Sequence, residues 1–72
     1  MKKFSVVIAH RHATSISLEE EFFEALNNLA KEQNIPFNAL ITKIDEKRIN
    51  ENLSSALRVY VLKELQNKIK NF

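Results

Sequence analysis

The spacing of apolar residues along the chain changes once, from a repeat of two to a repeat of three and four. Residues 13 to 18 alternate strictly, which predicts a half-buried strand over about residues 12–18. One side of this strand carries Thr14, Ile16 and Leu18, and the other side carries Ala13, Ser15 and Ser17.

The segment before this strand, residues 4–9, is also apolar and rich in β-branched side chains. This composition favours an extended chain, but the order of its residues is compatible with two arrangements. The segment forms either a second strand or an extension of the strand that follows, and the sequence leaves both open.

Three helices are predicted after the strand, over about residues 19–33, 36–47 and 53–69, from apolar residues spaced three and four apart. Ser17 and Glu20 have the spacing of a capping box, so we expect Ser17 to cap the first helix. Glutamates in its first turn also suit the helix dipole.

The ends of the helices carry their own signals. Asn34 stands where a helix usually ends on a residue with positive φ, and asparagine is the best choice for that position in a chain without glycine. Pro36 suits the start of the second helix, and Asn52 or Ser54 is expected to cap the third.

The predicted class is therefore mainly α, with one strand followed by helices. A single strand cannot satisfy its own backbone donors and acceptors, so it must pair with a second copy of the chain or with residues 4–9 as a hairpin. The apolar arc of the third helix is also wider than a chain of 72 residues can cover, which favours a partner chain there.

Composition narrows the classes of function. A chain of 72 residues forms one small domain of marginal stability, and the absence of cysteine excludes disulfides and thiolate zinc sites. The absence of glycine excludes glycine-rich phosphate loops in their standard form. Oligomerisation is then the leading source of stability, and no cofactor is expected. No apolar run approaches a membrane span, so we expect no membrane partner and a cytoplasmic location.

The net charge of +2 is unevenly distributed. Lys2, Lys3 and Arg11 make the first 18 residues basic, the first helix begins with glutamates, and the last third is basic again. Both basic ends suit an anion such as the DNA backbone, although each patch alone is also what an ordinary solvated surface looks like.

No set of nucleophile, base and orienting group can be assembled from the sequence, so enzymatic activity is not expected. His10 and His12 lie two residues apart and could supply half of a metal site, but no third ligand is fixed by spacing. We therefore predict no metal site.

The order of strand and helices, with two sequence motifs, resembles the ribbon-helix-helix DNA-binding proteins of the Arc and MetJ type. The motifs are His12–Glu19 (HATSISLE), preceded by Arg11, and Asn52–Arg58 (NLSSALR), with Phe22 and Phe23 on the helix between them. They are most similar to a bacterial subgroup with the signatures Thr-Ser-Ile-Ser-Leu-Glu and Asn-Leu-Ser-Ser-Ala-Leu-Arg.

This resemblance implies an intertwined homodimer whose two strands pair as an intermolecular antiparallel ribbon. The third helix is then an additional C-terminal helix, and its wide apolar arc is where a protein partner is expected. It also implies that the ribbon enters the major groove of double-stranded DNA and that the start of the second helix contacts phosphate. The residues then expected at DNA are Lys2, Lys3, Arg11, His12, Ala13, Ser15, Ser17, Phe37 and Asn38. The residues expected in the dimer core are Thr14, Ile16, Leu18, Phe22, Leu26, Leu40, Ile41, Ile44, Leu57, Tyr60 and Val61.

Two departures from the family pattern leave a second hypothesis in place. The outward residues Ala13, Ser15 and Ser17 are short and discriminate bases poorly, and Pro36 has no N–H to offer a phosphate. The first hypothesis is a homodimeric DNA-binding regulator. The second is a dimerisation or protein-interaction module, antitoxin-like or partner-binding, without sequence-specific DNA binding.

Overall fold

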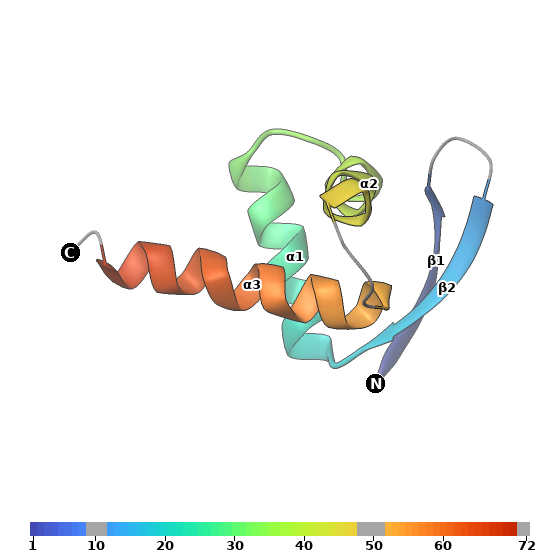
Figure 1. The fold of residues 1–72 in the computed structure, drawn as a ribbon, viewed down its shortest axis with the longest axis horizontal. Coiled ribbons are helices and arrows are strands. Elements are labelled where there is room, and N and C mark those ends of the chain that lie inside the picture. The colour runs from blue at the N-terminus through green and yellow to red at the C-terminus, as the bar shows by residue number, and fades with distance from the viewer. Residues whose placement is uncertain (9–11, 48–51, 71–72) are drawn as a thin grey trace.

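The chain folds as a β-hairpin followed by three helices. The computed structural model describes residues 1–8, 12–47 and 52–70. The hairpin lies at one end of the molecule, and the last helix extends away from it toward the opposite end (Figure 1). In chain order the elements are β1 (Lys2–Ile8), β2 (His12–Leu18), α1 (Glu20–Glu32), α2 (Phe37–Lys47) and α3 (Leu53–Lys70).

The two strands belong to the same chain and pair antiparallel, with Lys2 opposite Leu18 and Ile8 opposite His12. The expectation of a single strand is therefore wrong, and the hairpin alternative is the one the structure adopts. The physical reason lies in β1, where Phe4 and Val6 face the helices and Val6 is buried. Burying this apolar row gives β2 a backbone partner without a second copy.

The inner and outer faces of β2 follow the predicted alternation. Ile16 and Leu18 are buried and Thr14 is half-buried. The three residues between and before them, Ala13, Ser15 and Ser17, are exposed. The small side chains of β2 therefore lie on the solvent face of the hairpin.

The capping box expected at the start of α1 is absent. Glu19 is the N-cap, and its side chain makes no capping hydrogen bond. Its carbonyl oxygen accepts hydrogen bonds from the N–H groups of Phe22 and Phe23, at 3.0 and 3.1 Å. Ser17 is still within β2, opposite Lys3, because burial of Leu18 keeps the chain extended up to that point.

The end of α1 confirms the prediction for Asn34, which has φ 58°. The N–H of Asn34 donates to the carbonyl of Lys31 and the N–H of Ile35 donates to that of Ala30, both at 3.0 Å. These two bonds make a Schellman motif, which satisfies the last carbonyls of the helix. Ile35 then packs against the core, and Pro36 leads into α2.

One core joins the hairpin to all three helices. Of the residues expected in a dimer core, most are buried within the single chain, and Thr14, Phe22 and Tyr60 are half-buried. These residues form the core of one copy. That they also contact a second copy stays a prediction. The buried members of that set are Ile16, Leu18, Leu26, Leu40, Ile41, Ile44, Leu57 and Val61.

The first half of α3 holds its buried residues, whereas its second half touches α1 through the ion pair of Lys68 with Glu32. Asn52 caps the helix, as one of the two alternatives predicted, because its Oδ1 accepts a hydrogen bond from the N–H of Ser55 at 2.8 Å. Leu53, Ala56, Leu57 and Val61 are buried, and all of them lie before residue 62. Beyond that point the helix projects past the rest of the molecule (Figure 1) and leaves Leu62, Leu65 and Ile69 exposed.

Candidate nucleic-acid interface

The solvent face of the hairpin is built from two rows of exposed side chains. Directly paired residues in an antiparallel sheet point to the same face, so each residue of β2 has a neighbour on β1. The register pairs Lys3 with Ser17, Ser5 with Ser15, and Val7 with Ala13, and all six residues are exposed. The result is a ribbon face of small side chains with one cation, Lys3, and one large apolar side chain, Val7.

Ser5 and Val7 were not predicted as part of this face. The β1 row escaped notice because Val7 interrupts the apolar–polar alternation of Phe4, Ser5 and Val6, so the period of two is not visible in residues 4–9. Half of the Val7 side chain is exposed. Only the pairing with β2 shows on which side it lies.

Lys2 and Lys3 fall on opposite faces of β1, as adjacent strand residues must. The Lys2 Nζ lies 5.0 Å from the centre of the Phe23 ring, a cation–π distance. Lys2 therefore sits at the helical side of the hairpin, and Lys3 is the lysine of its solvent face.

The start of α2 lies against the outer edge of β1. The Asn38 side chain clamps the backbone of Val7, because its Oδ1 accepts from the Val7 N–H at 3.1 Å and its Nδ2 donates to the Val7 carbonyl at 2.8 Å. The amide of Asn38 is thus occupied by the fold. The backbone N–H groups of Phe37, Asn38 and Ala39 have no acceptor among the described residues, as expected for the first turn of a helix.

Three aromatic rings pack together where β1 meets α1 and α2. Phe4 lies edge-on to Phe23 and to Phe37, with ring centroids 4.9 and 5.5 Å apart. Phe23 and Phe37 are 5.2 Å apart. The Phe37 ring is therefore part of the packing that joins β1 to α1 and α2, and only its backbone N–H is available to a ligand.

The other edge of the hairpin is open. Alternate residues of an antiparallel strand turn their N–H and C=O groups to the partner strand. Val7 turns both groups away from β2, toward Asn38, so its partner Ala13 turns its own groups to the opposite edge, and Ser15 does the same. In the described part of the chain nothing pairs with these groups of Ala13 and Ser15.

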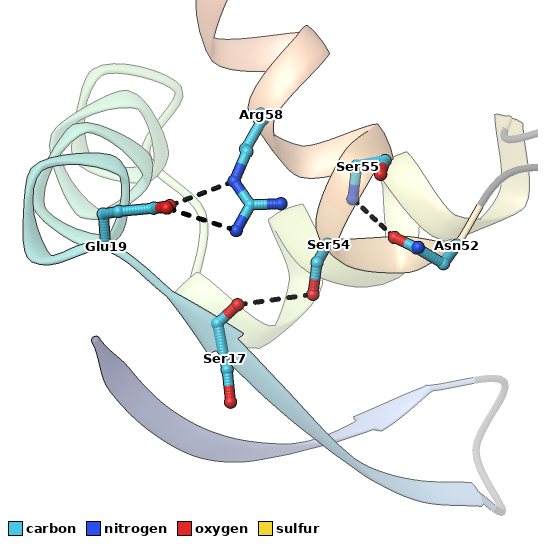
Figure 2. Close-up of polar contacts among 6 residues, drawn as sticks. All are labelled: Ser17, Glu19, Asn52, Ser54, Ser55 and Arg58. Atoms are coloured by element: carbon cyan, nitrogen blue, oxygen red, sulfur yellow. Dashed lines mark hydrogen bonds and ion pairs between the residues drawn. The ribbon is translucent and has the colours of Figure 1, made fainter.

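The start of α3 covers the end of that edge next to α1. The HATSISLE and NLSSALR motifs are in contact there. Figure 2 shows the Ser54 hydroxyl aimed at the carbonyl of Ser17, at 3.4 Å, and the Arg58 guanidinium against the carboxylate of Glu19. The Arg58 Nε lies 3.0 Å from Glu19 Oε1, and its Cζ lies 5.9 Å from the centre of the Phe22 ring. Arg58 therefore ties α3 to the β2–α1 junction.

The electrostatics of this junction favour an ionised Glu19. Its own backbone N–H lowers the pKa of the Glu19 carboxyl, and the hydrogen bond from Arg58 lowers it further. Sequence reasoning assigned no role to this pair. Glu19 and Arg58 each end one of the two motifs, but nothing in a sequence shows that residues 39 positions apart are in contact.

The remaining predicted residues divide into two groups. Arg11 and His10 lie outside the described residues, and His12 opens β2 opposite Ile8. Within the described ranges, no three His, Cys, Asp or Glu side chains gather as a metal site. Among the helices that are described, none has the length and hydropathy to cross a bilayer.

Comparison with known families identifies the fold. The model of the ribbon-helix-helix domain matches residues 1–65, which is nearly the whole chain, so the protein belongs to the ribbon-helix-helix domain family. Proteins of this family are generally DNA-binding regulators or antitoxins, they generally dimerise, and they are typically not enzymes. Searches of curated proteins and of solved structures give no match.

Proposed function

We propose that this protein is a homodimeric DNA-binding regulator that places the solvent face of its hairpin against the major groove. The observation that carries the proposal is the exposed face formed by Ser5, Val7, Ala13, Ser15 and Ser17, flanked by Lys3. A two-stranded β-ribbon fits the width of the major groove, and in the proposed dimer the two central β2 strands would be that ribbon. A regulator of this kind acts where the DNA is, in the cytoplasm of a bacterium.

The open edge of β2 supports the dimer. Unpaired N–H and C=O groups on an exposed strand are a template for another strand. Two copies joined at Ala13 and Ser15 would form an antiparallel sheet in the order β1, β2, β2, β1. The rows Ala13, Ser15 and Ser17 of both copies would then lie together at the centre of one face, which is the arrangement the family relationship favours.

Phosphate contacts carry most of the affinity in this proposal. Serine hydroxyls can bond to most base edges and so discriminate weakly between them. Lys3 on the solvent face, together with Arg11 and His12, supplies donors for phosphate, and so do the N–H groups of Phe37 and Asn38, which have no acceptor among the described residues. Lys2 was expected to join them, but it lies on the helical side of the hairpin, over Phe23. Binding should therefore depend strongly on salt and only modestly on sequence.

The experiment that tests this proposal compares Lys3→Ala with Lys70→Ala on a labelled duplex, by fluorescence anisotropy. Both lysines are exposed, but Lys70 is at the end of α3, far along the chain from the hairpin. We expect Lys3→Ala to weaken binding to every duplex tested and to reduce the salt slope by about one per lost contact, with Lys70→Ala close to wild type. Equal binding by the two variants would contradict this use of the hairpin face.

Arg11→Ala gives a second test of the same surface. Its position next to β2 in the sequence predicts weaker binding across all sequences, because an arginine there would contact phosphate and not a particular base. A variant that binds every duplex as tightly as wild type would show that this end of the ribbon is not a contact surface.

A second function, a protein-interaction module without DNA binding, is favoured by one observation. The solvent face carries one lysine among six side chains, and the others are too short for bidentate base contacts. An antitoxin-like role would fit such a surface. Binding to duplex DNA at low salt separates the two functions, because only the first requires it.

A further inference from the structure

A groove between α2 and α3 combines an apolar floor with a basic rim. Its volume is about 190 Å³, and Ile44, Ala56, Val59 and Tyr60 form its floor. The rim carries Lys43 and Lys47 from α2 and Lys63 from α3. None of these residues belongs to the hairpin, so the groove is separate from the surface proposed for DNA.

The rim is a concentration of positive charge. Among the described residues, no carboxylate lines the groove. The Lys43 Nζ donates to the neutral Gln33 Oε1 at 3.3 Å, and neither Lys47 nor Lys63 takes part in an ion pair among the described residues. By contrast, Arg58 pairs with Glu19, the N-cap of α1, at 3.0 Å, and Lys68 pairs with Glu32 of α1 at 2.7 Å. Lys47 and Lys63 are therefore available to a partner.

The floor determines what kind of anion fits. Val59 is 41% exposed although it lies between the packed residues of α3, and the Tyr60 ring lines the groove with its hydroxyl held by Gln33 Nε2 at 2.8 Å. An apolar floor gains nothing from a bare phosphate or sulfate, which would leave it exposed to water. It gains from a large apolar side chain, which would cover Val59 and the exposed part of Tyr60.

We infer that this groove binds a short acidic segment of another protein, one in which an aliphatic or aromatic side chain is flanked by carboxylates. The apolar side chain occupies the floor between α2 and α3. The carboxylates pair with Lys47 and Lys63 at the rim, and Lys43, one turn before Lys47, provides a third position. The complementary charge sets the orientation and the association rate, and burial of the apolar side chain supplies most of the affinity.

The test is a selection from a random dodecapeptide display library on the full-length protein, followed by anisotropy of the enriched peptides. We expect enriched peptides that join acidic residues to a large apolar residue. Their affinity should fall at least about tenfold on the Lys47→Glu, Lys63→Glu double variant, because each pair becomes repulsive. Lys70→Glu, an exposed lysine of α3 outside the groove, is the matched control and should bind like wild type.

A second variant guards against effects on the fold. Lys47→Met with Lys63→Met keeps the aliphatic stems and removes the charges, so its thermal unfolding should match wild type while peptide affinity still falls. Nuclear magnetic resonance shifts on peptide addition should centre on Val59 and Tyr60. Library enrichment of peptides without acidic residues, no enrichment, or unchanged affinity on both double variants would each overturn the proposal.

Two other occupants are distinguished by the same variants. If the groove is a DNA contact, the Lys47→Glu, Lys63→Glu variant loses duplex binding in parallel with Lys3→Ala. If a second copy occupies it, the variant sediments at a lower mass than wild type. Either result would overturn the peptide proposal, whereas loss of DNA binding by Lys3→Ala alone bears only on the proposed function.

Discussion

At the scale of single residues, Asn34 makes the turn between α1 and α2 possible in a chain without glycine. Its φ of 58° lies in the left-handed region, which most side chains enter only at a cost. Asparagine tolerates that region better than other residues because its short polar side chain bonds locally. The Schellman motif that follows fixes the direction in which Ile35 and Pro36 lead to α2.

We therefore expect Asn34→Ala to lower the free energy of unfolding by about 1 kcal/mol, since the alanine Cβ is strained at positive φ. Asn34→Gly is the matched control. It should be more stable than Asn34→Ala and close to wild type, because glycine adopts positive φ without strain. Urea denaturation followed by circular dichroism measures both. An alanine variant as stable as the glycine variant would contradict the assigned conformation.

Glu19 and Arg58 predict a pH dependence at the same scale. The lowered pKa of Glu19 means that its ionised form is stabilised by folding. The contribution is complete above the ordinary pKa of 4.5 and is lost as the pH falls through the lower pKa of the folded state. Glu19→Gln should therefore be less stable than wild type at neutral pH and should approach wild type in strong acid, below the lowered pKa of Glu19.

Denaturant unfolding at the two pH values checks this prediction. Glu24→Gln is the control, because this exposed residue of α1 takes part in no ion pair among the described residues. The same deficit for Glu19→Gln at both pH values would show that the charge of Glu19 does not matter to the junction.

At the scale of elements, the helices were predictable and the first strand was not. Apolar residues three and four apart place all three helices, because each helix buries one continuous face against the same core. The β2 strand shows its period of two for the same reason. In β1 the exposed Val7 breaks that period, so only long-range packing of Phe4 and Val6 identifies it as a strand.

In the candidate site, too, local patterns predict some features, and others depend on contacts between distant residues. The outward side of β2 follows from alternation alone. The positive φ of Asn34 follows from its place at the end of the first helix in a chain without glycine. Ser17 was misread as a helix cap because its spacing to Glu20 fits one, whereas the structure keeps it in the strand with its carbonyl bound to Ser54. Which residues lie opposite Ser5 or Glu19 depends on contacts across the sequence that no local pattern contains.

The open edge of β2 leads to a prediction about assembly. Ser15→Pro removes an N–H that points away from β1, so the hairpin should persist while pairing with a second copy is blocked. We expect this variant to sediment as a folded monomer at micromolar concentration, where wild type sediments as a dimer or larger. Thr14→Pro is the control, since the Thr14 N–H faces Val6 within the hairpin and its loss should destabilise the fold itself.

If Ser15→Pro sediments like wild type with unchanged circular dichroism, the dimer does not form through this edge. Wild-type protein that is a stable monomer at all concentrations would contradict the dimer altogether. In that case the exposed residues Leu62, Leu65 and Ile69 of α3 would not be an interface between copies either.

At the scale of the whole molecule, the chain presents two surfaces of different chemistry. The solvent face of the hairpin is small and polar with Lys3 beside it, and the α2–α3 groove is apolar with three lysines around it. The polar contacts of Ser54 and Arg58 fix α3 to the strand–helix junction between them (Figure 2). A protein of 72 residues thus has room for DNA and for a partner without the two sharing side chains.

The central claim is that the dimer binds DNA through several phosphates. Its most direct test is the affinity of wild-type protein for a labelled random duplex, measured by anisotropy between about 50 and 200 mM salt. We expect binding at low salt, with the logarithm of the affinity falling linearly and steeply with the logarithm of the salt concentration, because phosphate contacts release counterions. No affinity for any duplex at about 50 mM salt would contradict it and would leave the protein-interaction module as the function.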